Sequence, residues 1–256
     1  MLKFDIMKKF VLPLVLTVLF CSSCSQLFYQ QIATLSSDNV TLRDNGDYAY
    51  EDGMMTIEYD FWAESGKFTF IVTNNSDEYI YLNMAESYFI NNGYAQDYYQ
   101  ARTYLSVEGT SLNTNGKSIE FTEKAVVCIP AHSYKTFTEF SIATSVFREC
   151  GFVRDPSKKE TAVREYTKET SPQVIENRLM FNIGNITLPV TNVFYVSQYQ
   201  NISTDAATEW IKVEGCDGYK TPVRVHKLSA SNKFYITYGR EDLFPANGSG
   251  SNTDRQ

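Results

Sequence analysis

The sequence predicts an all-β fold: an antiparallel β-sandwich, immunoglobulin-like in architecture, with one or two short helical turns. Apolar and polar residues alternate over many short segments, as in half-buried strands, because successive Cβ atoms face opposite sides of a sheet. Turn-forming residues separate these segments at fairly regular intervals, and no long helical patterns alternate with them. The chain has 256 residues, which is enough to bury one sizeable core.

The clearest alternation lies in residues 54–62 and 67–84. In residues 54–62, Met55, Ile57, Tyr59 and Phe61 share one face. Residues 67–84 contain two alternating arms joined by a polar turn of Asn, Ser, Asp and Glu, which tolerate turn dihedrals. We expect these three strands to be consecutive neighbours in one antiparallel sheet.

Further strands are predicted along the second half of the chain. Residues 174–183, 193–199 and 234–238 each have strand composition, and Thr204 or Asp205 could cap a short helix. The predicted organisation is therefore a signal peptide (1–23), a lipidated tether (24–39), a β-sandwich domain (40–243) and a disordered tail (244–256). The tail is predicted because residues after Pro245 lack the apolar side chains of a core.

The first residues have the pattern of an export signal. Lys8 and Lys9 precede the apolar run of residues 10–20, which is too short to span a bilayer of about 30 Å that needs about 20 residues. The following Cys-Ser-Ser-Cys resembles the lipobox of bacterial lipoproteins, although that family usually has an aliphatic residue at the position of Cys21. The resemblance implies acyl chains, palmitate among them, on Cys24. The alternative is an ordinary secretory signal followed by a chance cysteine.

The residues after the lipobox predict the location. Ser25, rather than Asp, follows the cysteine, which in the lipoprotein family implies sorting to the outer membrane. Residues 25–31 carry no acidic side chain, whereas surface-export signals of Bacteroidetes lipoproteins do. We therefore expect a lipid-anchored protein on the periplasmic side rather than on the cell surface, with the membrane as a partner. Each buried methylene contributes about 0.8 kcal/mol, so several acyl chains give a stable anchor.

The charge of the chain argues against nucleic acid as a partner. The formal net charge is −7, and it becomes −9 once residues 1–23, with three lysines and one aspartate, are removed. Nucleic-acid binders need clustered Lys and Arg. The mature sequence has a single basic doublet, Lys158-Lys159, in a predicted loop.

Three cysteines follow the anchor: Cys128, Cys150 and Cys216. In an oxidising compartment they suggest one disulfide and one free thiol, with three possible pairings. Cys128–Cys150 closes the shortest loop and would contribute about 3 kcal/mol in the chain-entropy interpretation. The alternative is three buried, reduced cysteines. No metal site is expected, since no Cys or His lies two to four residues from any of them.

Aromatic residues are abundant, with 18 Tyr, 17 Phe and 2 Trp. Tyrosine combines apolar area with a polar tip, so it suits binding surfaces. The alternative is that the aromatic residues form cross-strand pairs and fill the core of a large sandwich. The candidate surface, for a glycan or an envelope protein, consists of Trp62, Tyr79, Tyr81, Tyr94, Tyr98 and Tyr99.

Catalytic motifs are sparse, so no catalytic residue and no cofactor are predicted. The two histidines, His132 and His226, could each serve as the base of a hydrolase acting in the cell envelope. No Gly-x-Ser-x-Gly elbow accompanies them. The leading hypothesis is a non-enzymatic binding or interaction module, and the hydrolase is the alternative.

Several stretches resemble an uncharacterised family of Bacteroidetes lipoproteins. They are residues 36–40 (SSDNV), 59–103 (from YDFWAESGKF to YYQART), 128–130 (CIP) and 192–197 (NVFYVS). The resemblance covers most of residues 24–203, with a shorter loop after Thr103. It implies a lipid-anchored envelope protein and supplies no catalytic residue.

Overall fold

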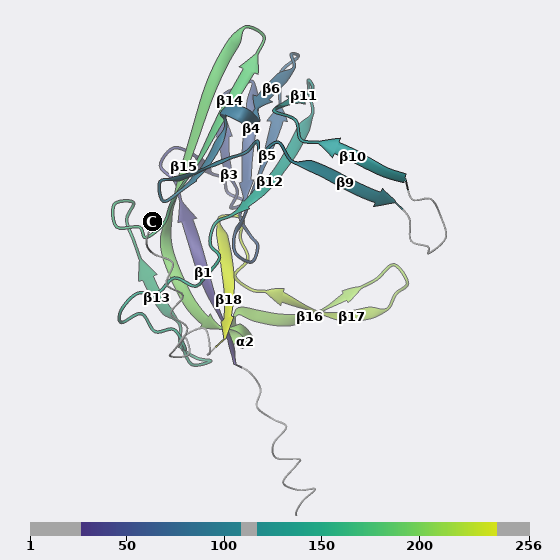
Figure 1. The fold of residues 1–256 in the computed structure, drawn as a ribbon. Coiled ribbons are helices and arrows are strands. Elements are labelled where there is room, and N and C mark those ends of the chain that lie inside the picture. The colour runs from purple at the N-terminus through teal and green to yellow at the C-terminus, as the bar shows by residue number, and fades with distance from the viewer. Residues whose placement is uncertain (1–26, 109–116, 240–256) are drawn as a thin grey trace, which may run out of the picture. The chain divides into compact units, whose positions relative to one another are not determined.

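The regular structure is almost entirely β, with two short helical turns, as predicted. A computed structural model describes residues 27–108 and 117–239 (Figure 1). The helical turns are η1 (Met84–Glu86) and α2 (Thr204–Ala207). The predicted signal peptide, Cys24 and the predicted tail (244–256) lie outside the described residues. Within the described residues, Tyr29–Tyr238 form one unit.

The described strands form two large sheets and two separate hairpins. The larger sheet contains β1 (Phe28–Ser36), β6 (Ile80–Asn83), β7 (Tyr88–Asn91), β8 (Tyr94–Asp97), β11 (Val126–Ile129), β13 (Ala162–Glu165), β14 (Val174–Ile183), β15 (Ile186–Ser203) and β18 (Lys233–Gly239). The smaller sheet contains β2 (Thr41–Leu42), β3 (Tyr48–Glu51), β4 (Met55–Asp60), β5 (Lys67–Asn74) and β12 (Tyr134–Ser141). The hairpins are β9 (Thr103–Glu108) with β10 (Lys117–Thr122) and β16 (Thr208–Glu214) with β17 (Lys220–His226).

The two large sheets share one hydrophobic core, so the predicted all-β, antiparallel sandwich class is confirmed. Alternate residues of β4 are buried: Met55 and Ile57 are fully buried and Tyr59 is 1% exposed. They pack in the same cluster as Phe181 of β14 and Phe194 of β15, from the larger sheet. This interleaving of apolar side chains from facing sheets is the arrangement that stabilises a sandwich.

A buried polar link also joins the sheets. The hydroxyl of Tyr59 in β4 accepts hydrogen bonds from Nδ2 of Asn177 in β14 (3.0 Å) and Nδ2 of Asn192 in β15 (2.6 Å). Both asparagines are fully buried. Because a buried amide without a partner is costly, this link favours one registration of the smaller sheet over the larger one.

The expected hairpin within residues 67–84 is wrong in one respect. β4 and β5 pair as predicted, but β5 belongs to the smaller sheet and β6 to the larger. The polar turn is therefore a crossover between sheets. The side chain of the buried Asn74 holds it, because Nδ2 donates to the carbonyls of Glu78 (2.7 Å), Ile129 (3.0 Å) and Pro130 (3.1 Å).

The predicted tether over residues 24–39 is also wrong for residues 28–36, which form a strand. Phe28–Ser36 form β1, which pairs antiparallel with the C-terminal half of β15. Ile32 is 2% exposed and Leu35 is fully buried. The apolar residues of this stretch fill the core, so the ordered domain begins at least ten residues earlier than expected.

The long strand β15 organises the larger sheet. Its first half pairs with β14, and its second half pairs with β1 on one side and β13 on the other (Figure 1). It ends at Ser203, whose side chain caps α2. The predicted short helix is thus confirmed, with its cap one residue earlier than expected. β16 follows directly.

Candidate functional site

The six aromatic residues predicted as one surface lie in different surroundings. Tyr79, Tyr81 and Tyr94 are exposed, whereas Trp62 and Tyr99 are half-buried. Trp62 packs on the small cluster of Ile32, Ile202 and Ala207, and its ring lies against Tyr235. The structure therefore does not support a single aromatic surface made of all six.

Tyr98 is a core residue, which corrects its assignment to the surface. It is 1% exposed, and its hydroxyl donates to Oδ1 of Asn177 at 2.8 Å. The backbone N–H of Tyr98 donates to the carbonyl of Ser87, which draws the segment after β8 back over the sheet. Burial raises the pKa of the Tyr98 hydroxyl well above its usual value. The second interpretation of the aromatic residues, as core fillers, applies here.

Tyr79 and Tyr81 both line a depression that we call the tyrosine pocket. Asp77, Glu78, Tyr79, Tyr81, Ala131 and Gly184 line about 400 Å³ of space there. The two tyrosines share a face because they are two residues apart along the strand. Asp77 also contacts His132, whose Nε2 lies 2.8 Å from its Oδ1.

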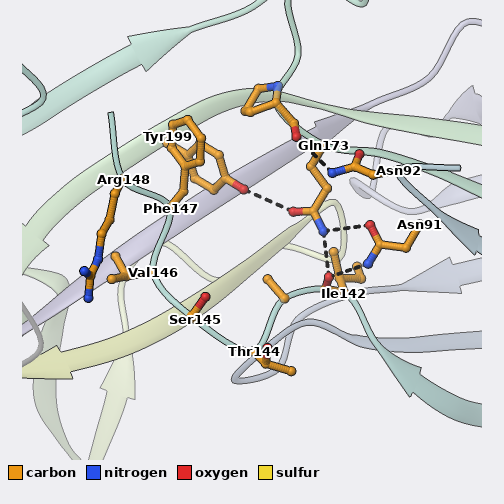
Figure 2. Close-up of a pocket in the computed structure, with 12 residues that line it drawn as sticks. Asn91, Asn92, Ile142, Thr144, Ser145, Val146, Phe147, Arg148, Gln173 and Tyr199 are labelled. Carbon is orange, nitrogen blue, oxygen red and sulfur yellow. Dashed lines mark hydrogen bonds between the residues drawn. The ribbon is translucent and has the colours of Figure 1, made fainter. Parts of the chain in front are cut away.

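A larger depression of about 580 Å³ lies beside β7 and β15. We call it the amide pocket, and it is bordered by Asn91 and Asn92, the segment 142–148, Pro172 and Gln173, and Tyr199 (Figure 2). Asn92 (φ 49°) and Gly93 (φ 81°) form the two-residue turn between β7 and β8. The Asn-Gly pair suits this turn because both residues adopt positive φ readily.

The floor of the amide pocket is a closed hydrogen-bond network around Gln173. Its Nε2 donates to the carbonyl of Ile142 (2.6 Å) and to Oδ1 of Asn91 (3.1 Å), and its Oε1 accepts from the hydroxyl of Tyr199 (3.1 Å) (Figure 2). Asn91 Nδ2 also donates to the Ile142 carbonyl (2.8 Å). These amides are buried or half-buried and satisfied by the protein, so they hold the floor in one conformation.

The side-chain amide of Gln31 holds the segment 142–148, which forms one side of the amide pocket. Gln31 in β1 is fully buried; its Nε2 donates to the carbonyl of Phe147 (3.0 Å) and its Oε1 accepts from the Phe147 N–H (2.7 Å). The ring of Phe147 stacks on Tyr199, with ring centroids 4.7 Å apart and planes at 13°. The segment 142–148, which has no regular secondary structure, is therefore held in place by side chains.

The rim of the amide pocket is polar, and the Asn92 side chain there donates to the Pro172 carbonyl (3.1 Å) and accepts from the Val174 N–H (2.8 Å). Asn92, Thr144, Ser145 and Arg148 are exposed there. Arg148 is the one charged residue among the lining side chains, and no carboxylate, histidine or cysteine lines the pocket. This chemistry suits recognition of hydroxyl or anionic groups, and the one lining side chain that could serve as a general acid or base, the Tyr199 hydroxyl, already donates to Gln173.

The two histidines differ in their surroundings. His132 and Asp77 are exposed, and no serine, threonine or cysteine lines the tyrosine pocket. The rings of His226, Trp62 and Tyr235 contact one another, and the buried Nδ1 of His226 has no hydrogen-bond partner. Burial, and next the charge of Arg224, lower the pKa of His226.

The expected Cys128–Cys150 disulfide does not form; Cys128, Cys150 and Cys216 are free thiols. Cys128 pairs with Tyr81 of β6, which pairs with Asn182 of β14, which pairs with Thr187. Cys128 therefore lies in line with the start of β15. Cys150 lies next to Glu149, which contacts Arg164 of β13 opposite the other half of β15. The two cysteines are thus separated by several strands and by much of the length of β15, far beyond the reach of an S–S bond.

Among the described residues, no group of three or more His, Cys, Asp and Glu side chains could hold a metal ion. In the same part of the chain, no helix has the length and apolar character needed to cross a membrane.

The sequence analysis did not single out the residues of the amide pocket. Gln31, Asn91, Gln173 and Tyr199 come from four separate strands or strand ends, so no local spacing marks them. The one local signal was the Asn-Gly turn, which indicates a turn and carries no information about a site.

The comparisons with known proteins give no relative. No family model matches the chain, no curated protein matches it, and no solved structure matches it.

Proposed function

We propose that the protein is a non-catalytic binding module of the bacterial envelope, held at the outer membrane by lipid on Cys24, with the amide pocket as its ligand site. The observation that carries this proposal is the pocket itself. Its floor is held by satisfied amides around Gln173, and its lining has no carboxylate, histidine or cysteine. Its volume of about 580 Å³ falls within the range of ligand pockets.

The rim chemistry favours a glycan as the ligand class. Thr144 and Ser145 supply hydroxyls and Arg148 a guanidinium, and such groups hydrogen-bond to sugar hydroxyls and carboxylates. The half-buried ring of Phe147 adds apolar area. A floor that is already ordered loses little conformational entropy when a ligand binds.

A glycan array followed by calorimetric titration of the mature chain tests this proposal. Ser145→Trp places an indole at the rim and should weaken binding about tenfold or more, equivalent to about 1.4 kcal/mol. Ile186→Trp is the matched control, because Ile186 is 59% exposed at the first residue of β15, away from the pocket. Absence of any glycan binder, or equal affinity of both variants, would refute the assignment of the pocket.

A hydrolase that uses His132 is the second candidate. It is supported by the 2.8 Å contact of His132 with Asp77, an arrangement that can orient an imidazole as a base. Against it, the hydroxyls of Ser76 and Ser133, which flank this pair in sequence, donate to carbonyl or amide oxygens of the turns. Turnover of chromogenic esters or glycosides that disappears in His132→Ala would favour this candidate, and the absence of turnover would remove it.

A further inference from the structure

The hairpin of β16 and β17, which we call the ribbon, carries an uncovered aliphatic face. Ile211, Val213 and Val223 lie on the same side, since Ile211 pairs with Val223 and Val213 with Thr221. Their exposed fractions are 40%, 46% and 40%. A two-stranded hairpin with no third strand is at best marginally stable in water, and contiguous exposed apolar side chains mark an interaction surface.

The base of the ribbon is fixed to the body of the protein. The Thr208 hydroxyl donates to the carbonyl of Thr204 (2.7 Å), and the Lys227 N–H donates to the carbonyl of Ala207 (2.9 Å). Ala207 is fully buried against Ile202 at the end of β15. The first residues of the ribbon are therefore held against α2 by hydrogen bonds.

The length of the chain limits how far the predicted anchor can lie from this base. Five residues of chain lead from Cys24 to Tyr29, which limits their separation to about 18 Å. Tyr29 pairs with Ser203, the residue that caps α2. The ribbon therefore begins at the end of β15 that a lipid on Cys24 would hold next to the bilayer.

We propose that the aliphatic face of the ribbon rests on the membrane that holds Cys24, as a second, non-covalent lipid contact. This inference depends on the lipid anchor proposed above. Apolar side chains on an otherwise polar element enter the boundary between headgroups and acyl chains. Tyr219, at the tip of the ribbon and 76% exposed, is a residue type enriched at that boundary.

The opposite face of the ribbon suits the headgroup layer and water. It carries Trp210, Lys212 and Arg224, with Trp210 paired to Arg224 across the strands. Long basic side chains and indole rings are amphipathic and favour this position. The same face also carries Glu214, which lies 3.5 Å from Lys220, and Glu209 lies at the base of the aliphatic face. The ribbon thus has one mainly aliphatic face and one charged, aromatic face.

Tryptophan quenching by brominated acyl chains tests the contact in the full lipidated protein reconstituted into vesicles of phosphatidylethanolamine and phosphatidylglycerol. The chain has two tryptophans, so Trp62→Phe with Trp210→Phe gives a silent background. Val213→Trp then reports on the aliphatic face. Ile186→Trp is the control reporter, because it lies at the opposite end of β15, about 50 Å away along the strand.

We expect brominated vesicles to quench the Val213→Trp emission about twofold or more relative to Ile186→Trp, since quenching requires contact with acyl chains. Adding Val223→Asp should reduce that quenching. If the protein floats with vesicles and neither reporter is quenched, the ribbon contact is refuted and the anchor stands. If wild type fails to float, or floats as well after Cys24→Ala, the anchor is refuted, and the argument for the ribbon falls with it. Unquenched emission together with a dimer in light scattering would assign the face to a second copy instead.

Discussion

The Tyr59 hydroxyl is the group best suited to test the packing of the two sheets, because two asparagines of the larger sheet donate to it. Tyr59→Phe removes that oxygen and leaves the ring, which is 1% exposed, in place. The amides of Asn177 and Asn192 then each lose an acceptor in the core. A buried donor without a partner costs about 1–3 kcal/mol, so we expect a loss of about 2–5 kcal/mol.

That loss is large compared with a total stability of about 5–15 kcal/mol for a domain. Urea unfolding of wild type and variant, followed by intrinsic fluorescence, measures it directly. Tyr94→Phe is the matched control, because Tyr94 is 72% exposed, and it should change stability by less than about 0.5 kcal/mol.

A second arm isolates the hydrogen bond to Asn192. In an Asn192→Leu background one of the two orphaned amides is absent, so Tyr59→Phe should cost about 1 kcal/mol less than in wild type. If Tyr59→Phe lowers stability by no more than the Tyr94→Phe control, the polar link does not stabilise the contact between the sheets.

Three further predictions concern pH and backbone conformation. The pKa of His226 is lowered in the folded state, so stability should fall as pH drops below about 6.5, the unfolded value, and His226→Gln should flatten that dependence in urea titrations at several pH values. Hydrogen bonds from Arg102 lower the pKa of Glu123 to about 2, so its contribution is present above the unfolded value near 4.5 and is lost as pH falls toward 2. Glu123→Gln should therefore reduce stability at pH 7 more than in strong acid, and an equal loss at both would contradict this. Gly66→Ala should lower the free energy of unfolding by about 1–3 kcal/mol more than Gly46→Ala, which a lower thermal midpoint would show. Both glycines have positive φ, but at Gly66 a Cβ would lie 2.8 Å from an aromatic carbon of β18.

Local pattern was sufficient for much of the secondary structure. The alternation in residues 54–62 predicted the buried face of β4 correctly, and the Asn92-Gly93 pair is of the type that favours the two-residue turn found between β7 and β8. The ribbon was missed although Gly215 and Gly218 mark its turn and Ile211, Val213 and Val223 alternate with polar residues; what the sequence does not show is that this hairpin is left uncovered.

The sequence by itself determined the all-β class and the main turns, because these follow from side-chain period and from the dihedral preferences of single residues. It also predicts the lipid anchor, an expectation that rests on a local motif resembling a lipobox. Only the tertiary structure decided that β5 and β6 belong to different sheets, that Tyr98 is buried and that Phe28–Ser36 belong to the core. The amide pocket belongs to the same class, since Gln31 contacts a backbone 116 residues away. Such contacts depend on which strands become neighbours, and no local spacing encodes that choice.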